Sequence, residues 1–191
     1  MIAVRQTLLI IGVAAGCIDA AVASAQQQAI VPSNTDTRVR AIVASFSKSK
    51  HVTKVRRGVS HEKYKEVRSE PVVRSKLESL SGTYEVEGLH LELHLNVDAN
   101  GRVSGSGEEQ EAEGVTRSFG LSDGKVEGAL LTATKRYPDG ATQQLEGVFI
   151  NMTSYDSPTD KGVTFFGLGV LSNPINISGL TMDKFFYRHK R

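Results

Sequence analysis

The amino-acid sequence predicts a mainly β protein: an up-and-down antiparallel β-barrel of about eight strands, preceded by a signal peptide and a basic, partly helical N-terminal arm. Three observations support this fold. Apolar and polar residues alternate without a break along residues 89–97, turn-forming residues recur at short intervals after residue 82, and no helical periodicity interrupts them. We therefore divide the chain into a signal peptide at 1–25, a basic arm at 26–81 and a barrel domain at 82–191.

The segment 1–25 has the three parts of a secretory signal peptide. Arg5 makes its start basic, residues 7–15 form an apolar run, and Ala23-Ser24-Ala25 is a small-x-small cleavage site. The apolar run is shorter than the roughly 20 residues that a membrane-spanning helix needs. We expect export to a periplasm or the medium, with no transmembrane span in the mature chain.

Cys17, the only cysteine, admits a second interpretation of this segment. Ala14-Ala15-Gly16-Cys17 resembles the cleavage box of bacterial lipoproteins, in which the cysteine becomes lipidated. Cleavage after Ala25 instead leaves a chain without cysteine, which its sheet and core alone must hold together.

Charge is distributed unevenly between the arm and the barrel. Residues 26–81 carry 12 Lys and Arg against 5 acids, whereas residues 82–191 carry 10 against 15. Within the arm, apolar residues at i, i+3, i+4 and i+7 predict an amphipathic helix at 37–46, with Asp36 or Thr37 as its N-cap. These apolar residues are Val39, Ile42, Val43 and Phe46.

The basic residues that follow, at 47–74, lack this periodicity. A solvated linker is the plain interpretation, and a segment that docks on anionic surfaces of the cell envelope is the alternative. Tyr64 is the only aromatic residue among these cations, so nucleic acid is not an expected partner.

The barrel strands are expected at 82–88, 89–98, 101–109, 113–121, 124–137, 141–154, 162–171 and 181–189. Turn signals separate them at Asn100-Gly101, Asp123-Gly124 and Pro138-Asp139-Gly140, and a longer loop spans 154–162. About eight such strands can close on themselves and so remove exposed edges. Segments 148–150 and 164–168 are apolar on both faces, and the helix at 37–46 is expected to cover them.

Gly82-Thr83-Tyr84, at the start of this meander, resembles the G-x-W opening of calycin-type barrels, the lipocalins and avidin-like proteins. Tyr84 stands where those families place tryptophan, and the resemblance covers the last 110 residues. It implies a small barrel that binds a ligand in its mouth or cavity.

We assign five candidate ligand-binding residues: Tyr84, His90, Glu92, His94 and Tyr137. His90, Glu92 and His94 alternate on one face of a predicted strand. At about 3.3 Å per residue the two histidines lie roughly 13 Å apart, too far to share one metal ion. We therefore assign no metal, no other cofactor and no catalytic residue.

Two further clusters were weighed as sites. The acidic run Glu108, Glu109, Glu111 and Glu113 lacks the Asp/Asn spacing of a calcium-binding loop, so a solvated loop is the simpler interpretation. Lys135, Arg136 and Tyr137 stand at a hairpin end, where barrel mouths bind ligands. Ser106, between two glycines, lies on a strand and not at the strand-to-helix turn of a hydrolase nucleophile.

These observations favour an exported, non-enzymatic binding module for a small or extended ligand. Two alternatives stay open. The first is an envelope-associated structural or assembly protein whose basic arm docks on anionic surfaces. The second is a barrel enzyme that gathers His90, Glu92, His94 and Tyr137 in a polar lumen.

Overall fold

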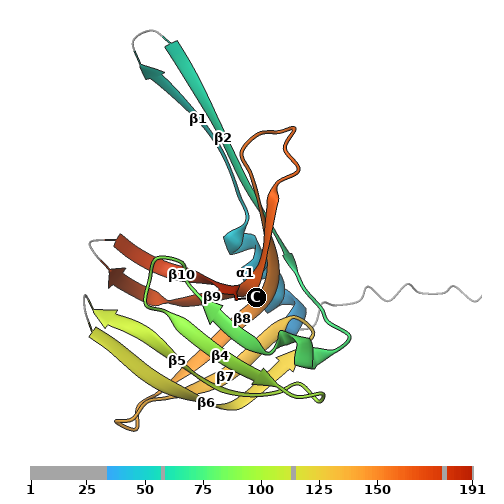
Figure 1. The fold of residues 1–191 in the computed structure, drawn as a ribbon, viewed down its shortest axis with the longest axis vertical. Coiled ribbons are helices and arrows are strands. Elements are labelled where there is room, and N and C mark those ends of the chain that lie inside the picture. Colours follow the sequence, from blue (N-terminus) through green and yellow to red (C-terminus); the bar gives the residue numbers. More distant parts are fainter. Residues whose placement is uncertain (1–33, 57–58, 113–114, 178–179, 191) are drawn as a thin grey trace, which may run out of the picture. The chain divides into compact units, whose positions relative to one another are not determined.

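The computed structural model describes residues 34–56, 59–112, 115–177 and 180–190, and the side chains of 34–49, 64–110, 115–172 and 182–190. The chain divides into two units, Met1–Val31 and Pro32–Arg191, and all described residues belong to the second. Helix α1 (Asn34–Phe46) comes first, and a short 3₁₀ helix η1 (Leu77–Leu80) precedes the barrel (Figure 1). The strands are β1 (Lys48–Arg56), β2 (Val59–Pro71), β3 (Gly82–Glu85), β4 (Glu92–Val97), β5 (Arg102–Ala112), β6 (Val115–Glu127), β7 (Leu130–Arg136), β8 (Thr142–Tyr155), β9 (Val163–Ile177) and β10 (Leu180–His189).

Strands β3 to β10 form a closed eight-stranded antiparallel barrel, which confirms the predicted fold. Each strand pairs with the next along the chain, and β10 returns to pair with β3 through Arg188 opposite Glu85 and His189 opposite Tyr84. Closure satisfies the backbone groups that an open sheet would leave at its edges.

The lumen is filled by the apolar residues of the strands. On β4, Leu93, Leu95 and Val97 are buried, whereas His94 and Asn96 on the opposite face are exposed. Across the lumen, Phe149 and Leu168 are fully buried and belong to the same cluster.

Strand β4 is shorter than predicted. It begins at Glu92, because residues 86–91 reverse the chain between β3 and β4. Val86 N–H donates to the Leu91 carbonyl at 3.0 Å, and Leu89 N–H donates to the Val86 carbonyl at 3.1 Å. The alternation of apolar and polar residues at 89–97 thus begins inside a turn. The predictions of strands at 82–88 and 89–98 were therefore wrong at their common boundary.

Asp123-Gly124 was predicted as a turn but is an irregularity inside β6. The register shifts there against both neighbouring strands, and Asp123 has a φ of 53°. Asp and Gly tolerate positive φ in bulges as well as in turns. The chain reverses instead at Gly128-Ala129, between Glu127 and Leu130.

Residues 47–74 do not form the predicted solvated linker. β1 and β2 pair as a long hairpin, and the end of β2, from Glu66 to Pro71, pairs with β8. This edge of β8 is available because β7 stops pairing with it at Val148. The hairpin was missed because both of its faces are polar along most of its length.

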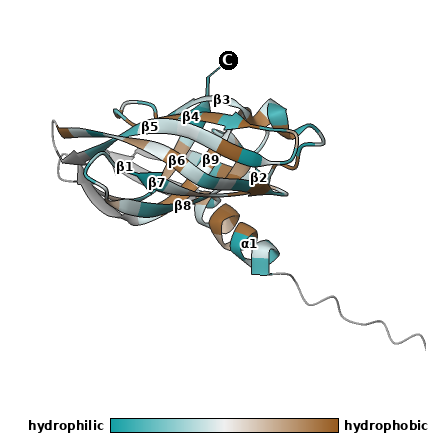
Figure 2. Cartoon of the chain, turned by 90° about the horizontal axis from the view of Figure 1, so that it is seen from below, coloured by the Kyte–Doolittle hydropathy of each residue, from teal (hydrophilic) through white to brown (hydrophobic). Residues whose placement is uncertain are grey.

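Helix α1 covers the outer face of the barrel, as predicted, and begins three residues earlier than expected. Ile42 and Phe46 are buried against Leu130, Val148 and Ile150. Figure 2 shows hydrophobic segments on α1 and on the strands of the barrel. Within the part of the chain that the structure describes, no helix has the length and apolar character needed to span a membrane.

Candidate functional site

A cavity of about 370 Å³ opens at the end of the barrel where β5 ends, β6 begins, and β7 turns into β8. Its apolar lining comes from Leu91, Val170, Phe185 and Tyr187. Its polar lining comes mainly from Glu109, Arg117, Lys135, Tyr137 and Gln143. We call this feature the mouth cavity.

The β7–β8 turn holds the polar wall in place. Tyr137 N–H donates to the Ala141 carbonyl, and Gly140 N–H donates to the Tyr137 carbonyl, both at 2.9 Å. Asp139 accepts the Ala141 N–H at 3.0 Å, and this hydrogen bond is the main cause that lowers the pKa of Asp139. Lys135 and Tyr137 point to the lumen because they alternate with the exposed Arg136.

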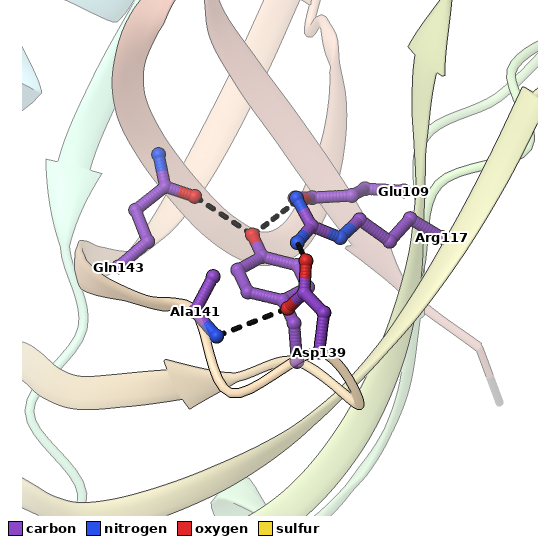
Figure 3. Close-up of polar contacts among 6 residues, drawn as sticks. Glu109, Arg117, Asp139, Ala141 and Gln143 are labelled. Carbon is purple, nitrogen blue, oxygen red and sulfur yellow. Dashed lines mark hydrogen bonds and ion pairs between the residues drawn. The ribbon is translucent and has the colours of Figure 1, made fainter.

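Glu109 is the centre of the polar wall. Its carboxylate lies 2.5 Å from Lys135 Nζ and accepts a hydrogen bond from the Tyr137 hydroxyl (Figure 3). The side chains of Lys135 and Glu109 are only 10% and 16% exposed, so the pair is largely removed from water. The Tyr137 hydroxyl also lies 2.9 Å from Gln143 Oε1.

Arg117 forms a second layer over this network. Its guanidinium lies 3.8 Å from the centre of the Tyr137 ring and donates to Asp139 at 2.5 Å. Phe119 meets the Tyr137 ring edge-on at 5.9 Å, and Lys135 Nζ lies 4.7 Å from the Phe119 ring. Cations over aromatic faces are favourable, and here they hold Tyr137 in one orientation.

The charged side chains of the mouth cavity are paired. Lys135 is paired with Glu109, and Arg117 is paired with Asp139, which lies outside the cavity lining. Deeper in the lumen, burial raises the pKa of Tyr187, and the Glu109 carboxylate raises it further. Tyr187 is therefore a neutral phenol at physiological pH, and the cavity combines an apolar floor with a polar wall whose charged side chains are engaged in ion pairs.

Of the five candidate residues, the structure brings only Tyr137 into the mouth cavity. Tyr84 is fully buried in the lumen, where its hydroxyl donates to the Leu80 carbonyl at 2.6 Å. Its ring packs against Phe149 and, at 4.9 Å, against His189. Tyr84 is thus a core residue near the end of the lumen that η1 covers.

The other three candidates lie outside the lumen. His90 is exposed in the turn before β4, and Glu92 and His94 are on the outer face of the strand. His94 Nδ1 lies 3.0 Å from Thr83 Oγ1, and Glu92 lies 3.5 Å from Lys190. The barrel-enzyme alternative placed these three side chains in the lumen, and the structure places them outside it.

Four of the polar residues that line the mouth cavity were not among the five assigned from the sequence, although Lys135 was noted at its hairpin end. Glu109 was interpreted as part of a solvated acidic loop, yet it faces the lumen while its neighbour Glu108 is exposed. Arg117, Lys135 and Gln143 complete the set. The sequence could have indicated these residues by their positions. Each is an inward-facing residue near a strand end, and all lie at the same end of the barrel.

A second, larger hollow of about 900 Å³ lies where β9 begins and β10 ends. Arg74 lies 4.9 Å from the Phe166 ring there, and Arg188 lies 4.2 Å from the Phe165 ring. The cations of this hollow, Arg74, Arg188 and Lys190, are exposed. Among the described residues, no group of three or more His, Cys, Asp or Glu side chains is arranged to hold a metal ion.

Fold and cavity together define the class: a closed, eight-stranded, up-and-down antiparallel β-barrel with a polar-walled cavity at one end. No protein-family model matches the chain, and the searches of curated proteins and of solved structures return no significant match.

Proposed function

We propose that this protein is a binding module that holds a small ligand in the mouth cavity, without transforming it. The observation that carries the proposal is the buried network of Glu109, Lys135 and Tyr137 above an apolar floor. A cavity of this size lies within the range of roughly 300 to 1,000 Å³ that is typical of small-molecule sites. Ligand binding at a barrel mouth also agrees with the calycin-like resemblance of the sequence.

The polarity of the residues that line the mouth cavity indicates which class of ligand fits it. Leu91, Val170 and Phe185 favour an apolar group at the floor. Gln143 and the Tyr137 hydroxyl offer hydrogen bonds at the wall, while the charged side chains there are already engaged with each other or with Asp139. An anionic ligand would have to displace Glu109 from Lys135, which would leave a buried charge unpaired. The ligand class that fits is therefore uncharged and amphipathic, with one hydrogen-bonding end. With the predicted signal peptide at 1–25, we place this binding outside the cytoplasm.

Filling the mouth cavity tests this function. Ser172 lines the cavity on β9, and its neighbour Leu171 points outward and is 42% exposed. We expect Ser172→Trp to weaken binding of the uncharged dye Nile red at least about tenfold, since an indole occupies the space that a ligand needs. Leu171→Trp is the matched control and should bind as the unmodified protein does.

The readout is dye fluorescence, with circular dichroism and thermal unfolding to verify that both variants are folded. The chain contains no tryptophan, so the indole of Ser172→Trp also reports directly on any occupant. Native mass spectrometry of the exported protein identifies a retained ligand. Equal dye affinity in both tryptophan variants would overturn the assignment of the mouth cavity as the binding site.

A further inference from the structure

The β1–β2 hairpin separates its charges onto two faces. Residues directly opposite each other in an antiparallel pair share a face, and successive pairs alternate between faces. One face therefore holds the pairs Lys48–Val67, Lys50–Lys65, Val52–Lys63, Lys54–His61 and Arg56–Val59. We call these ten positions the cationic face, because they include six Lys or Arg and no acidic residue.

The opposite face has the reverse composition. Its pairs are Ser49–Glu66, His51–Tyr64, Thr53–Glu62 and Val55–Ser60, with two acids and no Lys or Arg. Glu66 accepts hydrogen bonds from Tyr64 and Arg68, which lower its pKa, and so it remains engaged on its own face. Glu66 therefore does not neutralise the cationic face.

The cationic face continues onto the barrel at Lys184 of β10. Lys184 Nζ donates to the Ser45 carbonyl at 3.0 Å, at the C-terminal end of α1. Lys48 lies beside it, and the contact between the two ammonium groups, together with partial burial, lowers the pKa of Lys184. Two adjacent like charges repel, and an anion bound between them would relieve that repulsion.

Most of the hairpin has no further strand beside it. β2 pairs with β8 only from Glu66 to Pro71, and among the described strands β1 pairs with β2 alone. In Figure 1 the hairpin continues past the strands of the barrel to which its base is joined. Its cationic face is thus carried on a two-stranded ribbon that the barrel does not need for closure.

We propose that the cationic face docks on the surface of a lipid bilayer that contains anionic phospholipids. At about 3.3 Å per residue, its positions on one strand extend over roughly 26 Å, so several cations can approach one charged surface together. Val52, Val59 and Val67 are interleaved with the cations, and the headgroup region of a bilayer accepts both residue types. A linear polysaccharide has no apolar layer to match the three valine positions, and nucleic acid finds no Phe, Tyr or Trp position on this face, since Tyr64 belongs to the other one.

Two charge-matched variants test the proposal. The first replaces four cationic-face residues: Lys50→Gln, Lys54→Gln, Lys63→Gln and Lys65→Gln. The control removes the same number of charges from exposed barrel positions: Arg102→Gln, Lys125→Gln, Arg136→Gln and Lys161→Gln. Both keep the same residues 1–33, so any contribution of that segment to membrane binding is equal in the two.

Binding is measured by co-sedimentation with vesicles of phosphatidylcholine mixed with phosphatidylglycerol, and with vesicles of phosphatidylcholine alone, at low and high salt. Because each Lys or Arg near an anionic surface contributes about fivefold in affinity, we expect the hairpin variant to bind mixed vesicles at least about a hundredfold more weakly. The affinity of the barrel control for mixed vesicles should stay within a few-fold of that of the unmodified protein. High salt should release both proteins from the vesicles.

Three results would overturn the proposal. They are equal losses in the two variants, undiminished binding of the hairpin variant, and retention on immobilised heparin without any binding to mixed vesicles. The last result would reassign the cationic face to a linear polyanion. Thermal unfolding of each variant shows whether a loss of binding reflects a loss of fold.

Discussion

At the scale of single residues, Tyr84 shows how burial determines a role. Its side chain is fully buried, and its hydroxyl satisfies the Leu80 carbonyl at the end of η1. Burial also raises the pKa of Tyr84 above its ordinary value of 10.0. The phenol of the folded protein therefore stays neutral at a pH where the unfolded chain has already ionised.

Tyr84→Phe tests both properties. Near neutral pH we expect a loss of about 1–2 kcal/mol in the free energy of unfolding, because the buried Leu80 carbonyl loses its donor. The contribution that the raised pKa of Tyr84 makes to the free energy of unfolding is fully present below pH 10. It is lost as the pH rises further, because the phenol then ionises in the unfolded state and not in the folded state. The variant should therefore lose less stability than the unmodified protein between neutral pH and pH values above 10.

Urea unfolding at the two pH values measures this difference. Tyr155→Phe, on the part of β8 that pairs with β2, is the control and should follow the alkaline profile of the unmodified protein. An identical pH dependence for Tyr84→Phe would contradict the role assigned to this buried phenol.

At the scale of elements, the packing of α1 on the barrel depends on one close approach. Phe46 lies over Gly169 of β9, where a Cβ atom would come within 2.8 Å of Phe46 Cε2. The absence of a side chain at position 169 is what lets the ring reach the sheet. This contact joins the end of α1, and with it the start of β1, to the outer face of the barrel.

A double-mutant cycle measures this contact. We expect Phe46→Ala to cost about 3 kcal/mol through the cavity it leaves, and Gly169→Ala to destabilise the protein through its clash with the ring. In the double variant the clash with Phe46 is gone, so the cost of Gly169→Ala should fall by about 1 kcal/mol or more. Urea unfolding gives the four free energies.

Gly120→Ala is the matched control, because nothing lies within 4 Å of a Cβ atom at that position. Additive effects of Phe46→Ala and Gly169→Ala would show that the helix does not rest on this glycine.

At the scale of the whole barrel, closure rests on a short seam between β3 and β10. Among the described residues, two pairs join these strands, Arg188 with Glu85 and His189 with Tyr84. Lys190 N–H adds a hydrogen bond to the Thr83 carbonyl at 2.8 Å, and the rings of Tyr84 and His189 pack at the same place. The seam is therefore the point at which closure is most directly tested.

A cross-link provides the test. Directly opposite residues in an antiparallel pair have Cα atoms about 4.5–5.5 Å apart, within the range that a disulfide spans. We expect Glu85→Cys with Arg188→Cys to form an intramolecular disulfide, detected by mass spectrometry and by mobility in non-reducing gels. Glu85→Cys with Arg136→Cys, on the distant β7, should not cross-link. A free thiol pair at 85 and 188 under oxidising conditions would contradict closure.

The sequence predicts a strand well when one face of the strand is buried and apolar and the other face is exposed and polar. Leu93, Leu95 and Val97 alternate with polar residues, so local pattern was enough to identify β4, although not its start at Glu92. The hairpin of β1 and β2 has little such contrast, and its pairing with β8 depends on where β7 ends. Where β7 ends relative to β8 depends on the lengths of strands in the assembled sheet, and the residues of the hairpin alone do not reveal it.

The candidate site was less predictable for a related reason. Tyr137 was found because Lys135, Arg136 and Tyr137 stand together at a hairpin end, but Glu109 comes from a strand 28 residues away. Whether an acid at a strand end is solvated or buried depends on which side of the barrel wall it faces. His94 and Glu109 illustrate the two outcomes.

Local residue pattern therefore determines that this chain forms antiparallel strands, turns at Asn100-Gly101 and Pro138-Asp139-Gly140, and an amphipathic helix before them, because these features depend on neighbours in the sequence. Tertiary structure decides the rest: where β2 joins the edge of β8, which acid pairs with Lys135, and which residues of β1 and β2 lie opposite each other in the hairpin. Each of these depends on register between distant segments, and a shift of one residue would exchange the inner and outer faces of a strand.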